Sequence, residues 1–273
     1  MPVRRIETPD DPRIEVFGSL ADPDALAAHG LIAVEGRVVV ERLLRESAIV
    51  PEAVIVTDAA HRALQRVLDE ADPALPVWVV PRAWMEPLTG FNLHRGCVAL
   101  ARRPAPSRVG DLLAARPRRL LVLEGVGNPD NVGGLFRSAR ALGVEGVVLG
   151  PGSGDPLYRK AIRVSCGAAL VVPFARAGEW PGTLDLLRRH GLRVVALTPD
   201  PAAPPLTAVA GAYAREPLAL LVGAEGAGLS KAALAAADER MRIEMDPAAD
   251  SLNVGVAAAI ALHALRARET RLR

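Results

Sequence analysis

Hydrophobic and polar positions follow two different periods along the chain, and they alternate most regularly after residue 108. Short apolar runs predict strands, and apolar residues spaced three and four positions apart predict amphipathic helices. Strands are expected at residues 119–123, 146–149, 170–173, 192–197, 218–222 and 240–244. Helices are expected at residues 131–142, 157–165, 182–190, 230–237 and 252–268. This alternation predicts an α/β fold with a mostly parallel sheet that helices cover on both faces.

The N-terminal part of the chain alternates less regularly. Its pattern predicts helices at residues 38–45 and 61–70 and strands at residues 53–57, 76–80 and 97–100. These elements indicate a smaller α/β layer that follows an N-terminal extension. A basic, proline-rich stretch at residues 102–107 has the composition of an interdomain linker. We therefore predict one domain at residues 1–103 and a second at residues 108–273.

Composition narrows the classes of protein. Half of the residues are hydrophobic and 23% are charged, which is typical of globular proteins. Neither a signal peptide nor an uncharged apolar window of about 18 residues is visible, so we expect a cytoplasmic protein with no membrane span. Cys97 and Cys166 are too few for a disulfide framework or a zinc site and do not form a C-x-x-C pair, so no metal is expected. A net charge of +2 requires any nucleic-acid site to be a local arginine surface, and 3% aromatics argue against base stacking.

Three segments rich in glycine or polar residues each follow a predicted strand. They are residues 124–137, 221–230 and 242–257. In open α/β sheets, ligands bind outside the carboxyl ends of the strands, so this position alone makes the three segments candidates for a site.

Each segment also has a plainer interpretation. In the first segment a turn and a helix cap account for the asparagines and glycines, but they do not require Arg137. In the second segment a tight turn does not require Glu225. In the third segment Ser251 is a plausible helix N-cap and Asn253 an ordinary first-turn residue. A dinucleotide-binding loop is disfavoured because Asp130 stands where a glycine is expected.

In this order and spacing, the three segments resemble the signature motifs of the SpoU, or TrmH-like, branch of the SPOUT RNA methyltransferases. The first is similar to Asn-x-Gly-x-x-x-Arg, the second to Gly-x-Glu-x-x-Gly-Leu-Ser, and the third to Ile-Pro-Met…Ser-Leu-Asn-Val-Ser. The matching residues are Asn131, Gly133, Arg137, Gly223, Glu225, Gly228, Leu229, Ser230, Ile243, Met245, Ser251, Leu252, Asn253 and Val254. The sequence departs from the third motif at Glu244, Pro247 and Gly255. Residues 34–37 and 90–99 resemble, less specifically, an L30e-like RNA-binding domain.

The resemblance implies a trefoil knot in the larger domain, which would be a rare exception to unthreaded folds. It also implies S-adenosylmethionine as the methyl donor, in a pocket lined by Thr198, Gly223, Ile243 and Leu252. The expected assembly is a homodimer with its site at the subunit interface, a contact that the alanine-rich C-terminal helix would suit. The implied partner is RNA, with rRNA favoured over tRNA. Its contact surface would include Arg37, Arg95, Arg102 and Arg103.

The implied reaction methylates a ribose 2′-OH, with Arg137 as a catalytic residue that Asn131, Glu225, Ser251 and Asn253 support. A guanidinium stays protonated near neutral pH, so it suits gripping a phosphate and stabilising the developing alkoxide better than resting as a base. Its part in moving the proton is left open. One alternative is a non-catalytic RNA-binding protein of the same fold, against which the intact motifs argue. Another is a dinucleotide-dependent oxidoreductase, which the glycine spacing disfavours.

Overall fold

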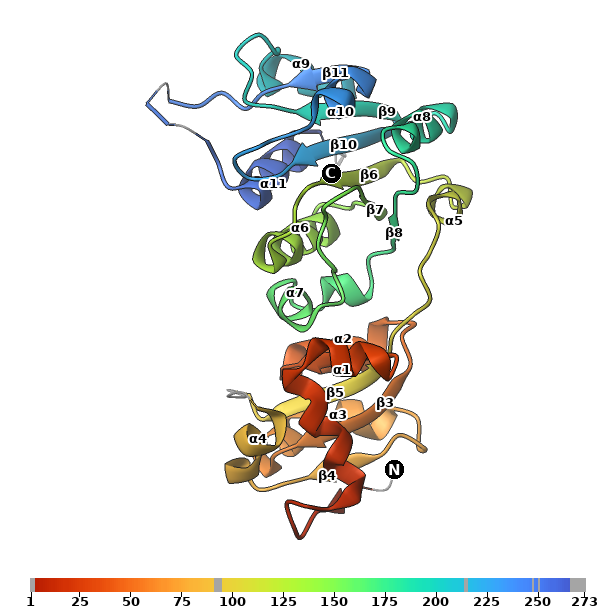
Figure 1. The fold of residues 1–273 in the computed structure, drawn as a ribbon, viewed down its shortest axis with the longest axis vertical. Coiled ribbons are helices and arrows are strands. Elements are labelled where there is room, and N and C mark those ends of the chain that lie inside the picture. Colours follow the sequence, from red (N-terminus) through yellow and green to blue (C-terminus); the bar gives the residue numbers. More distant parts are fainter. Residues whose placement is uncertain (1–2, 91–94, 214–215, 247, 250, 266–273) are drawn as a thin grey trace, which may run out of the picture. The chain divides into compact units, whose positions relative to one another are not determined.

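The computed structural model describes residues 3–90, 95–213, 216–246, 248–249 and 251–265 (Figure 1). The chain divides into two compact units. The first comprises Met1–Ala105 with Pro156–Val171, and the second comprises Pro106–Asp155 with Val172–Arg273. The first unit therefore includes residues 156–171, which the sequence pattern assigns to the larger domain. The linker-like stretch at residues 102–107 spans the first boundary between the units.

The second unit is built on a six-stranded sheet. The order β11-β9-β10-β6-β7-β8 places every strand parallel to its neighbours, which confirms the predicted class of sheet. The central pair is in register from Leu218 against Arg119 to Gly223 against Glu124. The strands are β6 (Arg119–Glu124), β7 (Gly146–Leu149), β8 (Phe174–Arg176), β9 (Arg193–Leu197), β10 (Leu218–Gly223) and β11 (Glu239–Met241).

Helices cover both faces of this sheet. On one face, the apolar sides of α5, α8 and α10 pack into a core with alternate residues of the strands, such as Leu120, Val194 and Leu221. On the other face, α11 packs against α6, α9 and β10. The bounds are α5 (Val109–Ala114), α6 (Pro129–Ala141), α8 (Gly182–Arg189), α9 (Leu206–Tyr213), α10 (Lys231–Ala236) and α11 (Val254–Leu265). The predicted last helix extends to residue 268, and its final residues lie outside the described part of the chain.

The expected strand at residues 170–173 was wrong. Its apolar residues begin instead in a short 3-10 helix, η2 (Ala168–Leu170), and strand β8 starts only at Phe174. Pro173 precedes that strand because proline has no N–H to donate to a sheet, although its carbonyl accepts a hydrogen bond from Val147 N at 2.9 Å. The apolar run reflects burial of Leu170 and Val172, and burial alone does not distinguish a strand from a tight helical turn.

The first unit has a smaller mixed sheet. Its order is β1-β4-β3-β5-β2, and β5 runs antiparallel to both of its neighbours. The strands are β1 (Val3–Arg5), β2 (Leu31–Glu35), β3 (Pro51–Val56), β4 (Val77–Val79) and β5 (Cys97–Arg102). The helices from residues 12 to 89 are the 3-10 helix η1 (Pro12–Ala21), α1 (Pro23–Ala28), α2 (Arg37–Glu46), α3 (Asp58–Glu70) and α4 (Arg82–Thr89). Thr57 caps α3 by accepting a hydrogen bond from Ala60 N at 3.3 Å.

Helix α7 (Arg159–Val164) belongs to this first unit and packs on β2. At the contact, the buried Glu35 carboxylate accepts a hydrogen bond from Arg159 at 2.8 Å and lies 3.8 Å from Arg163. Ser47 Oγ donates to the carbonyl of Leu170 at 2.8 Å, just beyond α7. A buried carboxylate of this kind needs such partners, because an unpaired buried charge is costly.

Candidate functional site

A cavity of about 600 Å³ opens at the carboxyl ends of β9 and β10. This is the edge of the sheet at which parallel α/β folds bind ligands. Three chain segments contribute to its wall: the end of β9 with the residues after it, the loop that follows β10, and the connection from β11 into α11. The lining residues are Leu197, Thr198, Pro199, Val222, Gly223, Ala224, Glu225, Gly226, Gly228, Ile243, Met245, Ser251, Leu252, Asn253, Val254 and Ala257.

All four residues that the resemblance assigns to the cofactor line this one cavity. Thr198 follows β9, Gly223 ends β10, Ile243 follows β11, and Leu252 stands two residues before α11. The structure thus brings together residues that are separated by up to 54 positions in the sequence. What they bind stays a prediction.

The loop after β10 folds tightly back on itself. Gly228 N donates to the carbonyl of Ala224 at 2.9 Å, and Ala227 N donates to the carbonyl of Glu225 at 3.1 Å. The returning chain passes so close to Gly223 that a Cβ atom there would lie 2.3 Å from the carbonyl carbon of Gly228. Glycine is therefore required at residue 223 by close backbone approach, and the fold places Glu225 near the tip of the loop.

Asn253 joins the three sequence motifs. Its Nδ2 donates to Asn131 Oδ1 at 2.9 Å and to Glu225 Oε1 at 2.7 Å. Its Oδ1 accepts hydrogen bonds from Gly255 N at 2.9 Å and Val256 N at 3.2 Å, so the same side chain caps α11. The expectation that Asn253 is an ordinary first-turn residue therefore understates it: Asn253 is the N-cap and the centre of a polar junction.

The remaining predicted residues occupy different positions. Ser251 lines the cavity. Arg137 is exposed on α6 and is not among the cavity-lining residues, and within the described part of the chain its side chain makes no hydrogen bond or ion pair. The structure therefore brings Asn131, Glu225 and Asn253 together and leaves Arg137 outside their cluster.

The structure describes two of the three residues at which the sequence departs from the third motif. Gly255 sits in the first turn of α11 and donates its N–H to Asn253. Glu244 is exposed and accepts a hydrogen bond from Thr207 Oγ1 at 2.6 Å. Pro247 lies outside the described residues. Neither of the two placed departures removes a contact of the Asn253 junction.

Glu124 is a site-adjacent residue to which the sequence pattern gives no role. It ends β6, is 8% exposed, and accepts hydrogen bonds from Trp180 Nε1 at 2.7 Å, Ser230 Oγ at 2.7 Å and Ser230 N at 2.8 Å. Its signal in the sequence is a carboxylate at the end of a strongly apolar strand, but the partners lie 56 and 106 positions away. Local spacing therefore could not reveal them.

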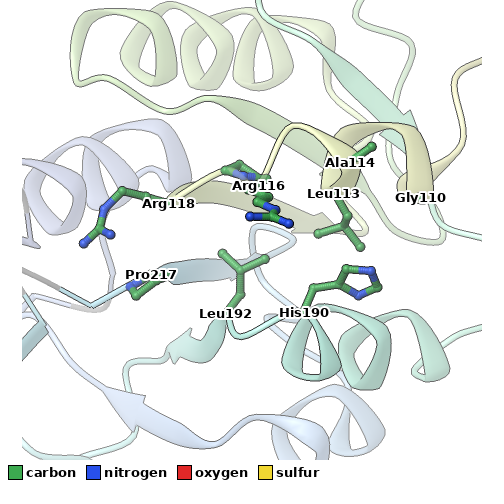
Figure 2. Close-up of a pocket in the computed structure, with 9 residues that line it drawn as sticks. Gly110, Leu113, Ala114, Arg116, Arg118, His190, Leu192 and Pro217 are labelled. Carbon is green, nitrogen blue, oxygen red and sulfur yellow. The ribbon is translucent and has the colours of Figure 1, made fainter.

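A second hollow, of about 580 Å³, lies at the opposite, amino-terminal ends of β6, β9 and β10. Figure 2 shows Arg116 beside Leu113 and Leu192, with His190 at the end of α8 and Arg118 extending away from them. Its nine lining residues include no carboxylate and none of the motif residues. Because parallel α/β sheets bind ligands at the other edge, the first cavity is the candidate site.

Two kinds of site are not found in the part of the chain that the structure describes. No group of three or more histidine, cysteine, aspartate or glutamate side chains is arranged to hold a metal ion. No helix among the described residues is long and apolar enough to cross a bilayer.

Comparison with known proteins places these motifs in a family. Residues 118–263 match the model of the SpoU rRNA Methylase family. An uncharacterized tRNA/rRNA methyltransferase of Mycobacterium bovis is 42% identical over 266 residues, which cover 96% of this chain and 91% of that protein.

Solved structures share the whole fold. A crystal structure of an RNA 2′-O ribose methyltransferase matches with a TM-score of 0.75 at 32% identity, covering 97% of this chain and 99% of that one. The AdoMet-bound rRNA methyltransferase from Sinorhizobium meliloti matches with a TM-score of 0.77 at 22% identity, covering 96% and 97% of the two chains, and supports the fold alone. With the family model matching more than half of its length and the three motifs gathered at one cavity, this chain belongs to the SpoU family of RNA methyltransferases.

Proposed function

We propose that this chain transfers a methyl group from S-adenosylmethionine to a ribose 2′-OH of RNA, with rRNA as the first candidate substrate and tRNA as the second. The observation that carries this proposal is the junction of Asn131, Glu225 and Asn253 at the cavity of about 600 Å³. Membership of the SpoU family implies S-adenosylmethionine as the methyl donor. The solved RNA 2′-O ribose methyltransferase at 32% identity supports the ribose assignment.

The cavity suits this cofactor in size and chemistry. Its volume falls within the usual range for small-molecule sites, about 300–1,000 Å³. Leu197, Ile243 and Leu252 supply apolar surface against which a purine can pack, and the glycine-rich loop offers backbone groups for hydrogen bonds. S-adenosylmethionine supplies an electrophilic methyl group on a positively charged sulfur.

The protein must then orient a ribose hydroxyl and assist the loss of its proton. The Glu225 carboxylate and the Asn131 amide oxygen are held in place by Asn253, so their direction is fixed before substrate binds. Ser251, on the same cavity wall, offers a hydroxyl that can donate or accept a hydrogen bond. Arg137 would hold the adjacent RNA phosphate and stabilise the developing alkoxide.

We propose a homodimer as the active form. Arg137 is exposed and does not line the cavity, so none of the cavity-lining residues in the described part of the chain carries a positive charge. On α11, Val256 and Ile260 are 49% and 40% exposed and stand one helical turn apart. Covering such apolar side chains favours association, and a second copy on α11 could bring its own Arg137 to the site.

We also propose that the first unit binds RNA through Arg37 and Arg95. Both side chains are exposed, and Arg95 Cδ would lie 4.0 Å from a Cβ atom at Gly36, next to Arg37. Arg102, the third expected contact, forms an ion pair with Glu52 and contributes less free charge. Arg37 and Arg95 are therefore better placed to contact phosphates.

The test is methylation of RNA from a strain that lacks this gene, using purified protein and a labelled methyl donor, followed by mapping of the labelled ribose. Arg137→Ala should abolish methyl transfer while S-adenosylmethionine still binds in calorimetry. Arg37→Ala should raise the KM for RNA and leave the affinity for S-adenosylmethionine unchanged. Near-normal turnover by Arg137→Ala would overturn the assigned role. Cofactor binding by the wild-type protein without transfer to any RNA would favour a non-catalytic RNA-binding protein.

A further inference from the structure

The Glu124 carboxylate is surrounded by three donors that come from distant parts of the chain. Trp180 lies in the connection between β8 and α8, and Ser230 is the N-cap of α10, where its Oγ also accepts a hydrogen bond from Ala233 N at 3.1 Å. Among the described residues, Glu124 forms no ion pair, so its buried charge is stabilised by these neutral donors alone. An acidic side chain in such a place must be well bonded, because burying an unpaired charge is costly.

The donors connect Glu124 to one wall of the cavity. Ser230 ends the segment that begins at Gly223, and this segment supplies five of the cavity-lining residues, among them Glu225. The residue after Glu124, Gly125, passes close to the same segment, because a Cβ atom added there would lie 3.1 Å from Ala224 Cβ. The loop is therefore fixed at its start by strand β10 and at its end by the Glu124 carboxylate.

The geometry requires a carboxylate and excludes an amide. Oε1 accepts from Trp180 Nε1 and Ser230 Oγ, while Oε2 accepts from Ser230 N. In a glutamine, one of these oxygens becomes an NH2 group. In either orientation that group faces an N–H donor, from the indole or from the backbone, and one hydrogen bond becomes a clash of two donors.

We propose that Glu124 is a positioning residue for the cofactor site: it holds Ser230, and through it the 223–230 loop, so that the cavity wall is formed and Glu225 meets Asn253. This role rests on the proposed assignment of the cavity to S-adenosylmethionine. Glu124 acts through Ser230 and does not itself line the cavity.

The test compares two carboxylates at opposite ends of β6. Glu145 precedes β7 and accepts hydrogen bonds from Arg118 N at 2.6 Å and Arg119 N at 2.9 Å, both through Oε2. Glutamine can reproduce that pattern with its single oxygen. Glu124→Gln and Glu145→Gln remove the same charge, but only Glu124→Gln should raise the Kd for S-adenosylmethionine in calorimetry, by about tenfold or more.

Three further variants separate positioning from general loss of structure. Ser230→Ala and Trp180→Phe each remove one donor to Glu124, and Ser230→Ala should raise the Kd more, because Ser230 belongs to the loop. The fold-increase in Kd that Glu124→Gln causes should be smaller in the Ser230→Ala variant than in the wild-type protein, because both substitutions act through one contact. Thermal unfolding of each variant, measured without cofactor, reports whether the chain is folded.

Two outcomes have distinct meanings. If Glu124→Gln folds and binds S-adenosylmethionine with a Kd within twofold of wild type, the positioning role is wrong. If Glu124→Gln does not fold, the role is wrong when both Ser230→Ala and Trp180→Phe bind S-adenosylmethionine with a Kd within twofold of wild type. Ala257→Phe fills the cavity from α11 and should abolish cofactor binding. If Ala257→Phe binds normally, the assignment of the cavity fails instead, whatever Glu124→Gln does.

Discussion

Asn253→Asp separates the two tasks that this side chain performs. Aspartate keeps the oxygen that caps α11, where Asn253 Oδ1 accepts from Gly255 N and Val256 N. Asparagine and aspartate are about equally good N-caps, and a negative charge is favourable at a helix N-terminus. The NH2 group that donates to Asn131 and Glu225 becomes an oxygen. The variant should therefore fold with a stable α11 and lose the polar junction.

The size of the effect follows from the contacts. A hydrogen bond to a charged acceptor contributes about 1.5–3 kcal/mol, and the bond from Asn253 to Glu225 would be lost. Two unit charges 2.7 Å apart, the present Nδ2–Oε1 separation, repel by about 1.5 kcal/mol at the dielectric constant of water. Together these give about 3–4.5 kcal/mol at the junction, which corresponds to a fall in kcat/KM of about 10²–10³. Because Glu225 is exposed, its side chain can turn away from the new aspartate in the Asn253→Asp variant. The free energy of unfolding therefore changes little, whereas a reaction that needs Glu225 in the junction still meets the cost.

The assay measures transfer of labelled methyl groups together with thermal unfolding. We expect the unfolding midpoint to change by less than about 2 °C, which is about 1 kcal/mol for a chain of this size. Asn253→Ser is the matched control, because serine also caps helices and adds no charge. It should lose less activity than Asn253→Asp. Turnover by Asn253→Asp within threefold of wild type would refute the proposed role of the junction.

Four other predictions concern stability, reactivity and assembly. Burial raises the pKa of the Cys97 thiol to about 12, well above its ordinary value of 9.0. The free energy of unfolding should therefore fall by about 1.4 kcal/mol per pH unit as pH rises from 9 to 12. Cys97→Ala should lack this pH dependence in urea titrations. At pH 8, iodoacetamide should label the partly exposed Cys166 in the native protein and leave Cys97 unmodified, and mass spectrometry showing equal labelling would contradict the burial. Arg159→Ala removes the hydrogen-bonded cation from the buried Glu35 carboxylate, and we expect a loss of about 1–3 kcal/mol in chemical unfolding, below the 3–5 kcal/mol of fully buried pairs because Arg159 is partly exposed; Glu35→Ala, which removes the buried charge itself, should cost less than Arg159→Ala. Ile260→Glu should dissociate the proposed dimer in analytical ultracentrifugation, and an unchanged mass would argue against an interface on α11.

Sequence patterns anticipated the elements that have strong local signals. Strand β7 begins and ends where the apolar run at residues 146–149 does, and the parallel sheet follows from the regular alternation of strands and helices. The positions of Thr198, Gly223, Ile243 and Leu252 on one cavity follow from a motif resemblance and from the common edge of parallel strands. The trefoil knot stays a prediction.

Other features depend on contacts that no local pattern encodes. The bonds from Trp180 and Ser230 to Glu124 span 56 and 106 positions, and each of these residues, taken alone, has an ordinary structural interpretation. Helix α9 was not predicted, because its run of small and apolar residues lacks a polar face to mark the helical period. The exposure of Arg137 was also hidden, since motif spacing does not say which way a side chain points.

The discontinuous makeup of the first unit has a consequence for its synthesis. During translation, β2 and α2 emerge more than a hundred residues before α7. The Glu35 carboxylate therefore cannot pair with Arg159 until the ribosome has passed residue 171 and the whole segment 156–171 has been made. A fragment that ends at the linker, at residue 105, would lack both Arg159 and Arg163, the two cations beside that carboxylate. The two units therefore cannot mature strictly one after the other, and completion of the N-terminal unit depends on a helical segment made midway through the other.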